Sequence, residues 1–282
     1  MKHKSFGATG VALPAIGQGT WNMPQSGAGR KEAVRALRHG ISLGMTHLDT
    51  AEMYGAGAVE ELLGEAIGGL ARERLFVASK VLPENATYEG TLKAARRSIA
   101  RLRCDYLDLY LLHWPGSHPL EETMRALEDL VEQGTVRFVG VSNFDTDEML
   151  AAASYLRKVP LACNQVLYHL NERGIEHRLI ETARRHDVAI VAYTPFGRGA
   201  FLREPSQREV LTAVAKKHEA TPRQVALAFL TRESNVFAIP KSTSLAHVQE
   251  NANAASMTLD AEDLAAIDRA FVRGRPGPLA TL

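Results

Sequence analysis

Apolar residues in this chain gather in short runs that alternate with longer amphipathic stretches. Runs such as LFVAS, LDLYLL, VAIVAY and VFAI are apolar at nearly every position, which is typical of parallel strands buried on both faces. The predicted strands cover residues 17–21, 46–49, 75–80, 106–112, 136–142, 162–165, 188–193 and 236–239. The intervening stretches predict helices over residues 30–43, 59–68, 87–102, 120–132, 146–154, 175–186, 207–218, 222–231, 245–251 and 260–271.

Eight strand–helix units with short connections favour one closed barrel. The length alone would also allow two small domains, but no Pro- or Ser-rich linker interrupts the pattern. We therefore predict a single (β/α)8 TIM barrel domain over residues 1–282. The opening stretch SFGATGVALPAIG alternates around glycines, so we expect an N-terminal β-hairpin that plugs the bottom of the barrel.

The composition and charge of the chain limit the kinds of partner that it can bind. Hydrophobic residues make up 45% and charged residues 23% of the chain, and the formal net charge is +1, so no strong field exists to attract nucleic acid or a membrane. Cys104 and Cys163 are the only cysteines, and their spacing argues against a disulfide framework or a zinc cluster. No apolar run is long enough for a signal peptide or a membrane span. We expect a cytoplasmic monomer that acts on a small molecule.

Polar residues collect where the predicted strands end, which in a parallel barrel is one rim, the rim that carries the chemistry. They are Asp49, Lys80, His113, Ser142, Asn143, Gln165, Tyr193 and Lys241. Tyr54 follows Asp49 in the turn THLDTAEMY. Reduction of a carbonyl group by hydride transfer needs this set of groups: a proton donor, a cation that lowers the pKa of the donor, an acid that holds the cation, and an imidazole that orients the substrate.

Several motifs occur in order along nearly the whole chain: GQGTW, DTAEMYG, SK, LLHWP, GVSNF, NQV, AYTPFGRG, IPKSTS and QEN. On these motifs the sequence resembles the aldo-keto reductase family, and within it the bacterial reductases of methylglyoxal and other small aldehydes. The resemblance implies a (β/α)8 barrel that uses NADPH without a metal to reduce small aldehydes and ketones. No GxGxxG motif opens a helix, so a Rossmann site is not indicated.

The resemblance makes Asp49, Tyr54, Lys80 and His113 the catalytic residues. A phenol has a pKa near 10, so a buried ammonium at Lys80 is expected to lower the pKa of Tyr54, the proton donor. Asp49 would keep Lys80 charged, and His113 would donate a hydrogen bond to the substrate carbonyl. Taken singly, each residue also has an ordinary role: Asp49 as a turn cap, Tyr54 as packing, Lys80 as a structural ion pair, and His113 as a core histidine.

The resemblance also implies a cofactor site. Ser142, Asn143 and Gln165 would bond the nicotinamide carboxamide, and Tyr193 would stack on its ring. The segment TPFGRG would wrap the pyrophosphate through its backbone N–H groups. The full set of expected cofactor residues is Thr20, Trp21, Asp49, Ser142, Asn143, Gln165, Tyr193, Thr194, Phe196, Gly197, Lys241, Ser242, Thr243, His247, Glu250 and Asn251.

At the adenosine end, Lys241, Ser242 and Thr243 match the segment that holds the 2′-phosphate, and the predicted helix after it starts at Ser244 as N-cap. His247 stands where many family members place an arginine, and histidine lacks the bidentate fork of a guanidinium. We therefore expect NADPH to be preferred, with NADH accepted more weakly.

The expected substrate site is formed by Trp21, Tyr54, His113 and Trp114. The connection WPGSHPLEE is short and few residues follow Phe271, which implies an open site for small carbonyl compounds. Two other classes of function remain to be weighed. One is a catalytically slow regulatory subunit that binds the cofactor on the same fold. The other is a metal-dependent barrel hydrolase, which no HxH pair or strand-end His/Asp cluster supports.

Overall fold

The computed structural model describes residues 1–282, whose parallel strands form one eight-stranded sheet. The order β10-β9-β8-β7-β6-β5-β4-β3 follows the sequence, and the sheet curls so that its edges meet. Ile16 forms a parallel bridge with Ala238, and Gly17 N donates to Ala238 O at 2.8 Å, which closes the barrel. The strands are β3 (Gln18–Gly19), β4 (His47–Asp49), β5 (Phe76–Val81), β6 (Leu107–Leu112), β7 (Val136–Ser142), β8 (Leu161–Leu167), β9 (Ala189–Tyr193) and β10 (Val236–Ala238). The predicted barrel is confirmed.

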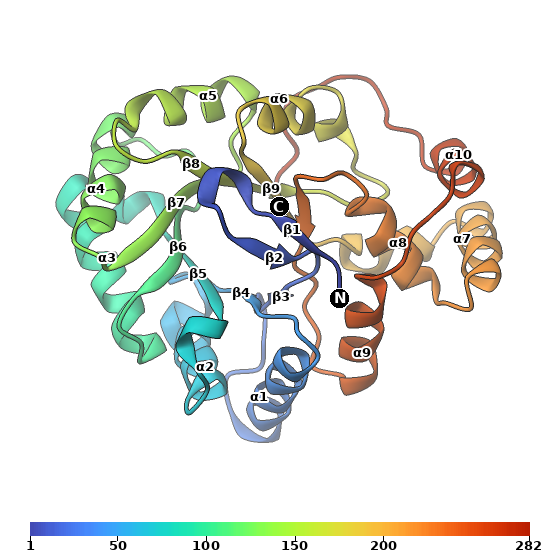
Figure 1. Cartoon of the computed structure of the whole chain (residues 1–282), viewed down its shortest axis with the longest axis horizontal. Helices are drawn as coiled ribbons and strands as arrows, with labels where there is room; N and C mark the ends of the chain where they lie inside the picture. Colours follow the sequence, from blue (N-terminus) through green and yellow to red (C-terminus); the bar gives the residue numbers. More distant parts are fainter.

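The helices form a ring around the strands (Figure 1). They are α1 (Gly27–Ser42), α2 (Ala58–Ile67), α3 (Tyr88–Leu102), α4 (Leu120–Glu132), α5 (Thr146–Tyr155), α6 (Leu179–Arg185), α7 (Pro205–Lys217), α8 (Pro222–Leu230), α9 (Leu245–Ala254) and α10 (Ala261–Ala270). Helices α7 and α10 pack on each other outside the ring. Ser244 caps α9 as expected, since its hydroxyl accepts from His247 N.

One predicted helix, over residues 175–186, is interrupted. The structure has a 3-10 turn, η5 (Gly174–Glu176), followed by α6. The backbone of Arg178 leaves the helical region at φ −146° and ψ −43°, and helical bonding restarts with Thr182 N donating to Arg178 O. The spacing of apolar residues along this segment gives no sign that the helix is interrupted.

The N-terminal hairpin lies across the bottom of the barrel, where Figure 1 shows it in dark blue. It consists of β1 (His3–Ser5) and β2 (Ala12–Pro14), paired antiparallel. Phe6 follows β1 and is fully buried, with its ring 5.0 Å from that of Phe237 and 5.2 Å from that of Phe76. Aromatic rings at such spacings pack favourably, so the hairpin closes the barrel as predicted.

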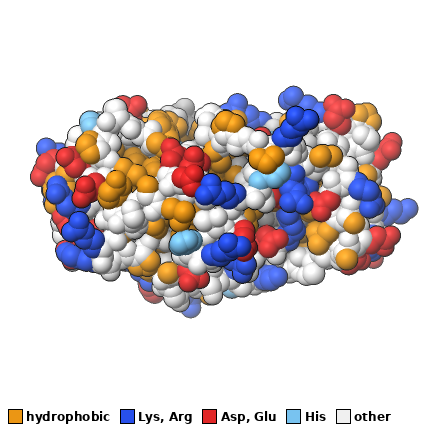
Figure 2. All heavy atoms as spheres, turned by 90° about the horizontal axis from the view of Figure 1, so that it is seen from above, with side chains coloured by type: hydrophobic (Ala, Val, Ile, Leu, Met, Phe, Trp, Pro, Cys, Tyr) orange, Lys and Arg blue, Asp and Glu red, His pale blue; other side chains and the backbone are white.

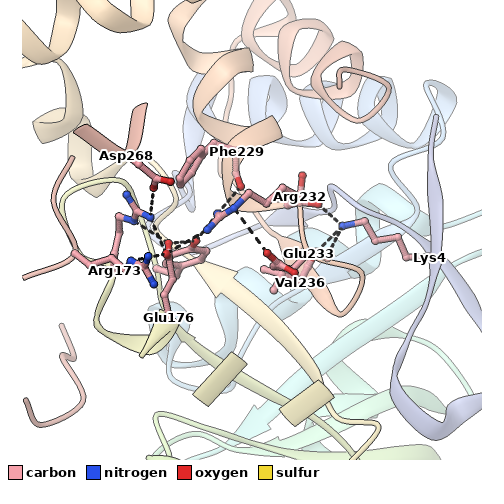
Figure 3. Close-up of polar contacts among 11 residues, drawn as sticks. Lys4, Arg173, Glu176, Phe229, Arg232, Glu233, Val236 and Asp268 are labelled. Atoms are coloured by element: carbon pink, nitrogen blue, oxygen red, sulfur yellow. Dashed lines mark hydrogen bonds and ion pairs between the residues drawn. The ribbon is translucent and has the colours of Figure 1, made fainter. Parts of the chain in front are cut away.

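Lys4 fastens this hairpin to the connection between α8 and β10. Its ammonium donates to Glu233 O at 2.8 Å and Val236 O at 3.0 Å, and also to Thr231 O (Figure 3). Burial, and secondly the charge of Lys2, lowers the pKa of Lys4 to about 8. The carbonyl oxygens therefore solvate an ammonium group that has no carboxylate partner.

A second buried cluster fixes the segment after α10. Glu176 pairs with Arg173 at 2.7 Å and with Arg232 at 3.2 Å (Figure 3). Burial alone would raise the pKa of Glu176, but its arginine partners outweigh burial and lower it. Arg173 also donates to Phe271 O at 2.6 Å, so the C-terminal segment starts from a fixed point.

The alternation of side chains between the two faces of each strand explains where the polar side chains point. Side chains two apart along a strand share a face. The interior of the barrel is filled by twelve buried residues: Phe6, Leu13, Phe76, Ala78, Leu109, Leu111, Ala162, Cys163, Ala189, Val191, Phe237 and Ile239. Lys80 continues the inward series of β5, His113 that of β6, and Tyr193 that of β9. Each therefore points into the barrel at its C-terminal mouth.

Charged side chains of both signs are mixed over the face drawn in Figure 2. No helix has the length and apolar character required to cross a membrane.

That residues 1–282 form a single domain remains a prediction from the sequence.

Candidate active site

Lys80 is the centre of a polar cluster at the mouth of the barrel. Its ammonium donates to Asp49 Oδ1 at 2.7 Å, to Thr50 O at 2.8 Å and to the hydroxyl of Tyr54 at 3.4 Å. Lys80 is fully buried and Asp49 nearly so. Tyr54 reaches the cluster from the turn after β4, where it begins the 3-10 segment η2 (Tyr54–Gly57). The structure thus brings three of the four predicted catalytic residues into contact.

The carboxylate of Asp49 has partners on both oxygens. Besides the contact with Lys80, Oδ2 accepts a hydrogen bond from Gln165 Nε2 at 2.8 Å. Thr20, also fully buried, donates to Asp49 O at 2.8 Å. A buried charge needs such partners, because an unpaired one is costly.

The pKa values of Lys80 and Tyr54 move in the same direction. Burial by itself would lower the pKa of Lys80, but Asp49 and then Tyr54 outweigh it, and the net pKa is raised. Burial raises the pKa of Tyr54, and the opposing effect of Lys80 is smaller. As predicted, the charge of Lys80 lowers the pKa of Tyr54, but burial raises it by more, so the net pKa of the phenol is raised.

His113 follows β6 and faces Tyr54, with ring centroids 5.9 Å apart in an edge-on arrangement. Burial, and secondly the charge of Lys80, lowers the pKa of His113 to about 2. The imidazole is therefore neutral at physiological pH. Its Nδ1 is buried and makes no hydrogen bond. A neutral imidazole retains one N–H donor, which is what orienting a carbonyl oxygen requires.

These groups open into a cavity of about 500 Å³. Its lining comes from the C-terminal ends of strands around the barrel and from the loops after them: Gly19, Trp21, Asn22, Asp49, Met53, Tyr54, His113, Trp114, Ser142, Asn143, Gln165, Tyr193, Thr194, Pro195, Phe196, Arg198, Ile239, Lys241 and Leu282. All four predicted substrate residues are among them.

One side of the cavity carries a hydrogen-bonded polar set. Asn143 Oδ1 accepts from the hydroxyl of Tyr193 at 2.7 Å, and Asn143 Nδ2 donates to His113 O at 3.0 Å. Ser142 donates to Gln165 O at 2.8 Å. The backbone of Asn143 is left-handed at φ 61°, a conformation that non-glycine residues rarely adopt and that often marks functional sites.

The residues present fit a nicotinamide dinucleotide. Gln165 uses its Nε2 on Asp49 while its Oε1 makes no hydrogen bond, which leaves an acceptor free for a carboxamide N–H. Tyr193 lines the same cavity as Gln165, and its aromatic ring is suited to stack on the nicotinamide ring. Lys241 lines the cavity and has no carboxylate within 4.0 Å, so its charge is available to a phosphate.

Some predicted cofactor residues do not line the cavity. Thr20 is buried directly after β3, Gly197 begins the 3-10 segment η6 (Gly197–Leu202), Ser242 and Thr243 lie between β10 and α9, and His247, Glu250 and Asn251 lie on α9. Their predicted roles remain predictions. His247 is exposed in the first turn of α9, and Glu250 Oε2 accepts from the hydroxyl of Thr221 at 3.4 Å.

Trp21 and Trp114 form walls of the cavity, as predicted for the substrate site. The segment after Phe271, from which we expected little wall, contributes one lining residue, Leu282. An extended chain reaches up to about 3.3–3.6 Å per residue, so residues 272–282 can run from α10 to the mouth of the barrel.

Sequence reasoning missed several lining residues: Gly19, Asn22, Met53, Pro195, Arg198, Ile239 and Leu282. Met53 precedes Tyr54 in the same turn, and Arg198 lies within the segment TPFGRG. Both could have been predicted as site residues, because they stand next to residues that were. Leu282 has no predicted site residue near it in the sequence, and it reaches the cavity only through the tertiary fold.

The model described as the aldo/keto reductase family matches residues 15–271. The chain is 44% identical over 262 residues to methylglyoxal reductase YeaE of Escherichia coli (strain K12), covering 93% of this chain and 92% of that protein. It is 35% identical over 271 residues to glyoxal reductase of Bacillus subtilis (strain 168), covering 95% and 93%. The aldo/keto reductase from Klebsiella pneumoniae in complex with NADP and acetate is 41% identical, with a TM-score of 0.92 and 100% of both chains covered.

These matches place the chain among NAD(P)H-dependent oxidoreductases built on a (β/α)8 barrel. It belongs to the aldo/keto reductase family. The predicted reaction class and the predicted nicotinamide cofactor are confirmed by this membership, and the hydrolase alternative is ruled out.

Proposed function

We propose that this protein reduces small aldehydes and ketones to alcohols with NADPH, and that Tyr54 donates the proton. The observation that carries the proposal is the position of Lys80, whose ammonium contacts Asp49 at 2.7 Å and Tyr54 at 3.4 Å beside the same cavity that His113 lines. A cation held by an acid and touching a phenol is an arrangement for moving a proton from that phenol.

Each residue has a distinct part. NADPH, when bound, supplies the hydride that the carbonyl carbon accepts. The carbonyl oxygen takes the proton of Tyr54, and Lys80 stabilises the phenolate that remains. Asp49 keeps Lys80 charged and fixed. The neutral His113 donates a hydrogen bond to the same carbonyl oxygen and sets its direction.

The raised pKa of Tyr54 is compatible with this role. A donor must carry its proton before the reaction, and burial keeps the phenol protonated at neutral pH. Charge develops on the phenol oxygen only as the proton leaves, and at that stage the contact with Lys80 gains strength.

The cofactor assignment follows the cavity wall. We assign Ser142, Asn143 and Gln165 to the nicotinamide carboxamide and Tyr193 to its ring. Lys241, with Ser242 and Thr243, is assigned to the 2′-phosphate, which makes NADPH the preferred cofactor. Further roles at this site are assigned to Thr20, Trp21, Thr194, Phe196, Gly197, His247, Glu250 and Asn251. Two related Klebsiella pneumoniae structures carry NADP and NADPH, which supports the choice.

Methylglyoxal and similar small carbonyl compounds are the proposed substrates. A cavity of about 500 Å³ suits a small molecule. The names of the Escherichia coli and Bacillus subtilis relatives, methylglyoxal reductase and glyoxal reductase, support the same class. The complete catalytic cluster disfavours a slow regulatory subunit. We further propose that residues 1–282 act as one domain and as a cytoplasmic monomer.

The proposal is tested by following NADPH oxidation with methylglyoxal, glyoxal, small aromatic aldehydes and a steroid ketone. We expect the small aldehydes to have the higher kcat/KM, and NADH to support slower reduction. A higher kcat/KM for the steroid ketone than for every small aldehyde would contradict the substrate class. The absence of oxidation with any carbonyl compound would contradict the reaction.

A further inference from the structure

Lys80 holds the phenol of Tyr54 less firmly than it holds its other two partners. The ammonium lies 2.7 Å from Asp49 Oδ1 and 2.8 Å from Thr50 O, but 3.4 Å from the hydroxyl of Tyr54. Hydrogen bonds from nitrogen to oxygen are usually about 2.7–3.2 Å long. The contact with Lys80 is therefore too weak to fix the phenol, and the position of Tyr54 depends on the turn that carries it.

The backbone leaves Tyr54 through three left-handed residues. Gly55, Ala56 and Gly57 have φ values of 58°, 51° and 95°. A non-glycine residue such as Ala56 is strained in this region, and such a conformation persists only where the surrounding structure holds it. The turn therefore needs an anchor on the other side of Tyr54.

Glu52, two residues before Tyr54, is that anchor. It is 6% exposed, and its Oε1 accepts hydrogen bonds from Leu82 N at 2.8 Å and from Asn85 Nδ2 at 2.9 Å. Its backbone N also donates to Lys80 O at 3.3 Å. Leu82 follows β5, the strand that carries Lys80. One carboxylate thus ties the turn of Tyr54 to the end of the strand of Lys80.

Glu52 does not line the cavity. Its second oxygen, Oε2, pairs at 3.3 Å with Arg97 of α3, whose side chain is half-exposed. A pair with an exposed partner contributes little. The carboxylate can therefore affect the reaction only through the position of the groups that it holds, and mainly through the two hydrogen bonds on Oε1.

We propose that Glu52 is a positioning residue for the reduction, and that it holds the hydroxyl of Tyr54 within reach of Lys80 and of the substrate carbonyl. The inference rests on the proposed role of Tyr54 as proton donor. A displacement of a reacting group by about 1 Å can cost on the order of a hundredfold in rate. Loss of the hydrogen bonds on Oε1 frees the turn, so proton transfer slows while cofactor binding is unchanged.

The test compares two substitutions of Glu52. Glu52→Met removes the acceptor and keeps the length of the side chain, and we expect kcat for methylglyoxal to fall by roughly ten- to hundredfold. Glu52→Gln keeps an amide oxygen for the same two donors, so its kcat should stay within about threefold of wild type. The Kd of NADPH, measured by fluorescence titration, should be unchanged in both. Should Glu52→Met fail to fold, Glu52→Asp, which draws the carboxylate back by one carbon, takes its place with the same expectation.

Glu128→Met is the matched control. Glu128 lies on α4, is 5% exposed, and its Oε1 accepts from Arg157 N at 2.8 Å and from Val159 N at 3.3 Å. None of these residues lines the cavity. The substitution breaks an anchor of the same kind elsewhere in the fold, so it should lower the stability to urea and leave kcat as in wild type.

A double variant separates positioning from a merely structural role. Residual reduction by Tyr54→Phe does not use the proton of the phenol. Adding Glu52→Met to Tyr54→Phe should therefore lower kcat by no more than about twofold, whereas a general structural defect would lower it by the same factor in both backgrounds.

Three results would overturn the inference. They are wild-type kcat in Glu52→Met, an equal loss from Glu52→Met with and without the hydroxyl of Tyr54, and a loss in Glu52→Gln as large as that in Glu52→Met. Each would leave the proposed function intact as long as Tyr54→Phe alone loses most of its kcat. A Tyr54→Phe protein with wild-type kcat would instead contradict the proposed function, and the inference with it.

Discussion

Gln165 and Asp49, which lie on β8 and β4, are joined across the barrel by a hydrogen bond of 2.8 Å from Nε2 to Oδ2. The other oxygen of Asp49 contacts Lys80 at 2.7 Å. One carboxylate therefore connects an amide at the proposed cofactor site with the ammonium that contacts Tyr54. The buried acid acts as the common anchor of both halves of the site.

Removing Lys80 should expose the cost of that buried carboxylate. Lys80→Met keeps the length of the side chain and removes its charge, which leaves Asp49 without its cation. We expect a loss of about 3–5 kcal/mol in the free energy of unfolding, measured by urea denaturation, together with loss of carbonyl reduction. The double variant Lys80→Met/Asp49→Asn should recover much of the stability and none of the activity. A double variant as unstable as the single one would show that the pair is not what stabilises the site.

The interior of the barrel predicts a dependence of stability on pH. His47 is fully buried, and its ring nitrogens make no hydrogen bond. Burial lowers the pKa of His47 from 6.5 to about 4. The unfolded chain therefore takes up a proton near pH 6.5 while the folded protein resists until about pH 4, so the stabilisation is present above pH 6.5 and is lost as the pH falls toward 4. The shift corresponds to about 3 kcal/mol.

The measurement is urea unfolding of wild type and His47→Phe between pH 7 and pH 4. The variant keeps a ring beside Phe6 and Phe76, whose centroids lie 5.7 and 5.4 Å from that of His47. We expect a shallower loss of stability with acid in the variant than in wild type. The exposed His186→Gln serves as control and should follow wild type. Identical pH profiles for wild type and His47→Phe would contradict the assignment.

Cofactor preference is tested at His247. An arginine at this place adds a permanent charge and a bidentate fork, so His247→Arg should tighten NADPH binding at pH 8 by up to about tenfold and leave NADH nearly unchanged. Fluorescence titration with both cofactors measures this. Equal NADPH affinity in wild type and variant would mean that His247 does not face the 2′-phosphate.

The strand pattern explains why so much of the rim was predictable. Inward positions repeat every second residue, so a polar residue two places after an inward apolar one, as in Lys80 after Ala78 or His113 after Leu111, points into the mouth of the barrel. Strand order and closure follow from the alternation of strands and helices. These features depend on local periodicity, which the sequence displays.

Loops do not share that periodicity. The position of Arg198 depends on three successive left-handed residues, and that of Leu282 on an anchor at Arg173 that lies far from it in sequence. The direction of the net pKa shift of Tyr54 could not be predicted from the sequence either. Burial raises this pKa more than Lys80 lowers it, and the degree of burial is known only from the folded structure. Long-range contacts and desolvation are properties of the assembled site.

The central claim is that Tyr54 donates the proton, and Tyr54→Phe tests it most directly. The variant removes one hydroxyl group and keeps the ring. Steady-state reduction of methylglyoxal with NADPH should show kcat lowered by about 10²–10⁴-fold, since general acid catalysis is lost, while the Kd of NADPH stays nearly unchanged. Tyr155→Phe, at the exposed end of α5, is the matched control and should keep wild-type kcat. A Tyr54→Phe protein that retains more than about a tenth of wild-type kcat at saturating substrate would contradict the account.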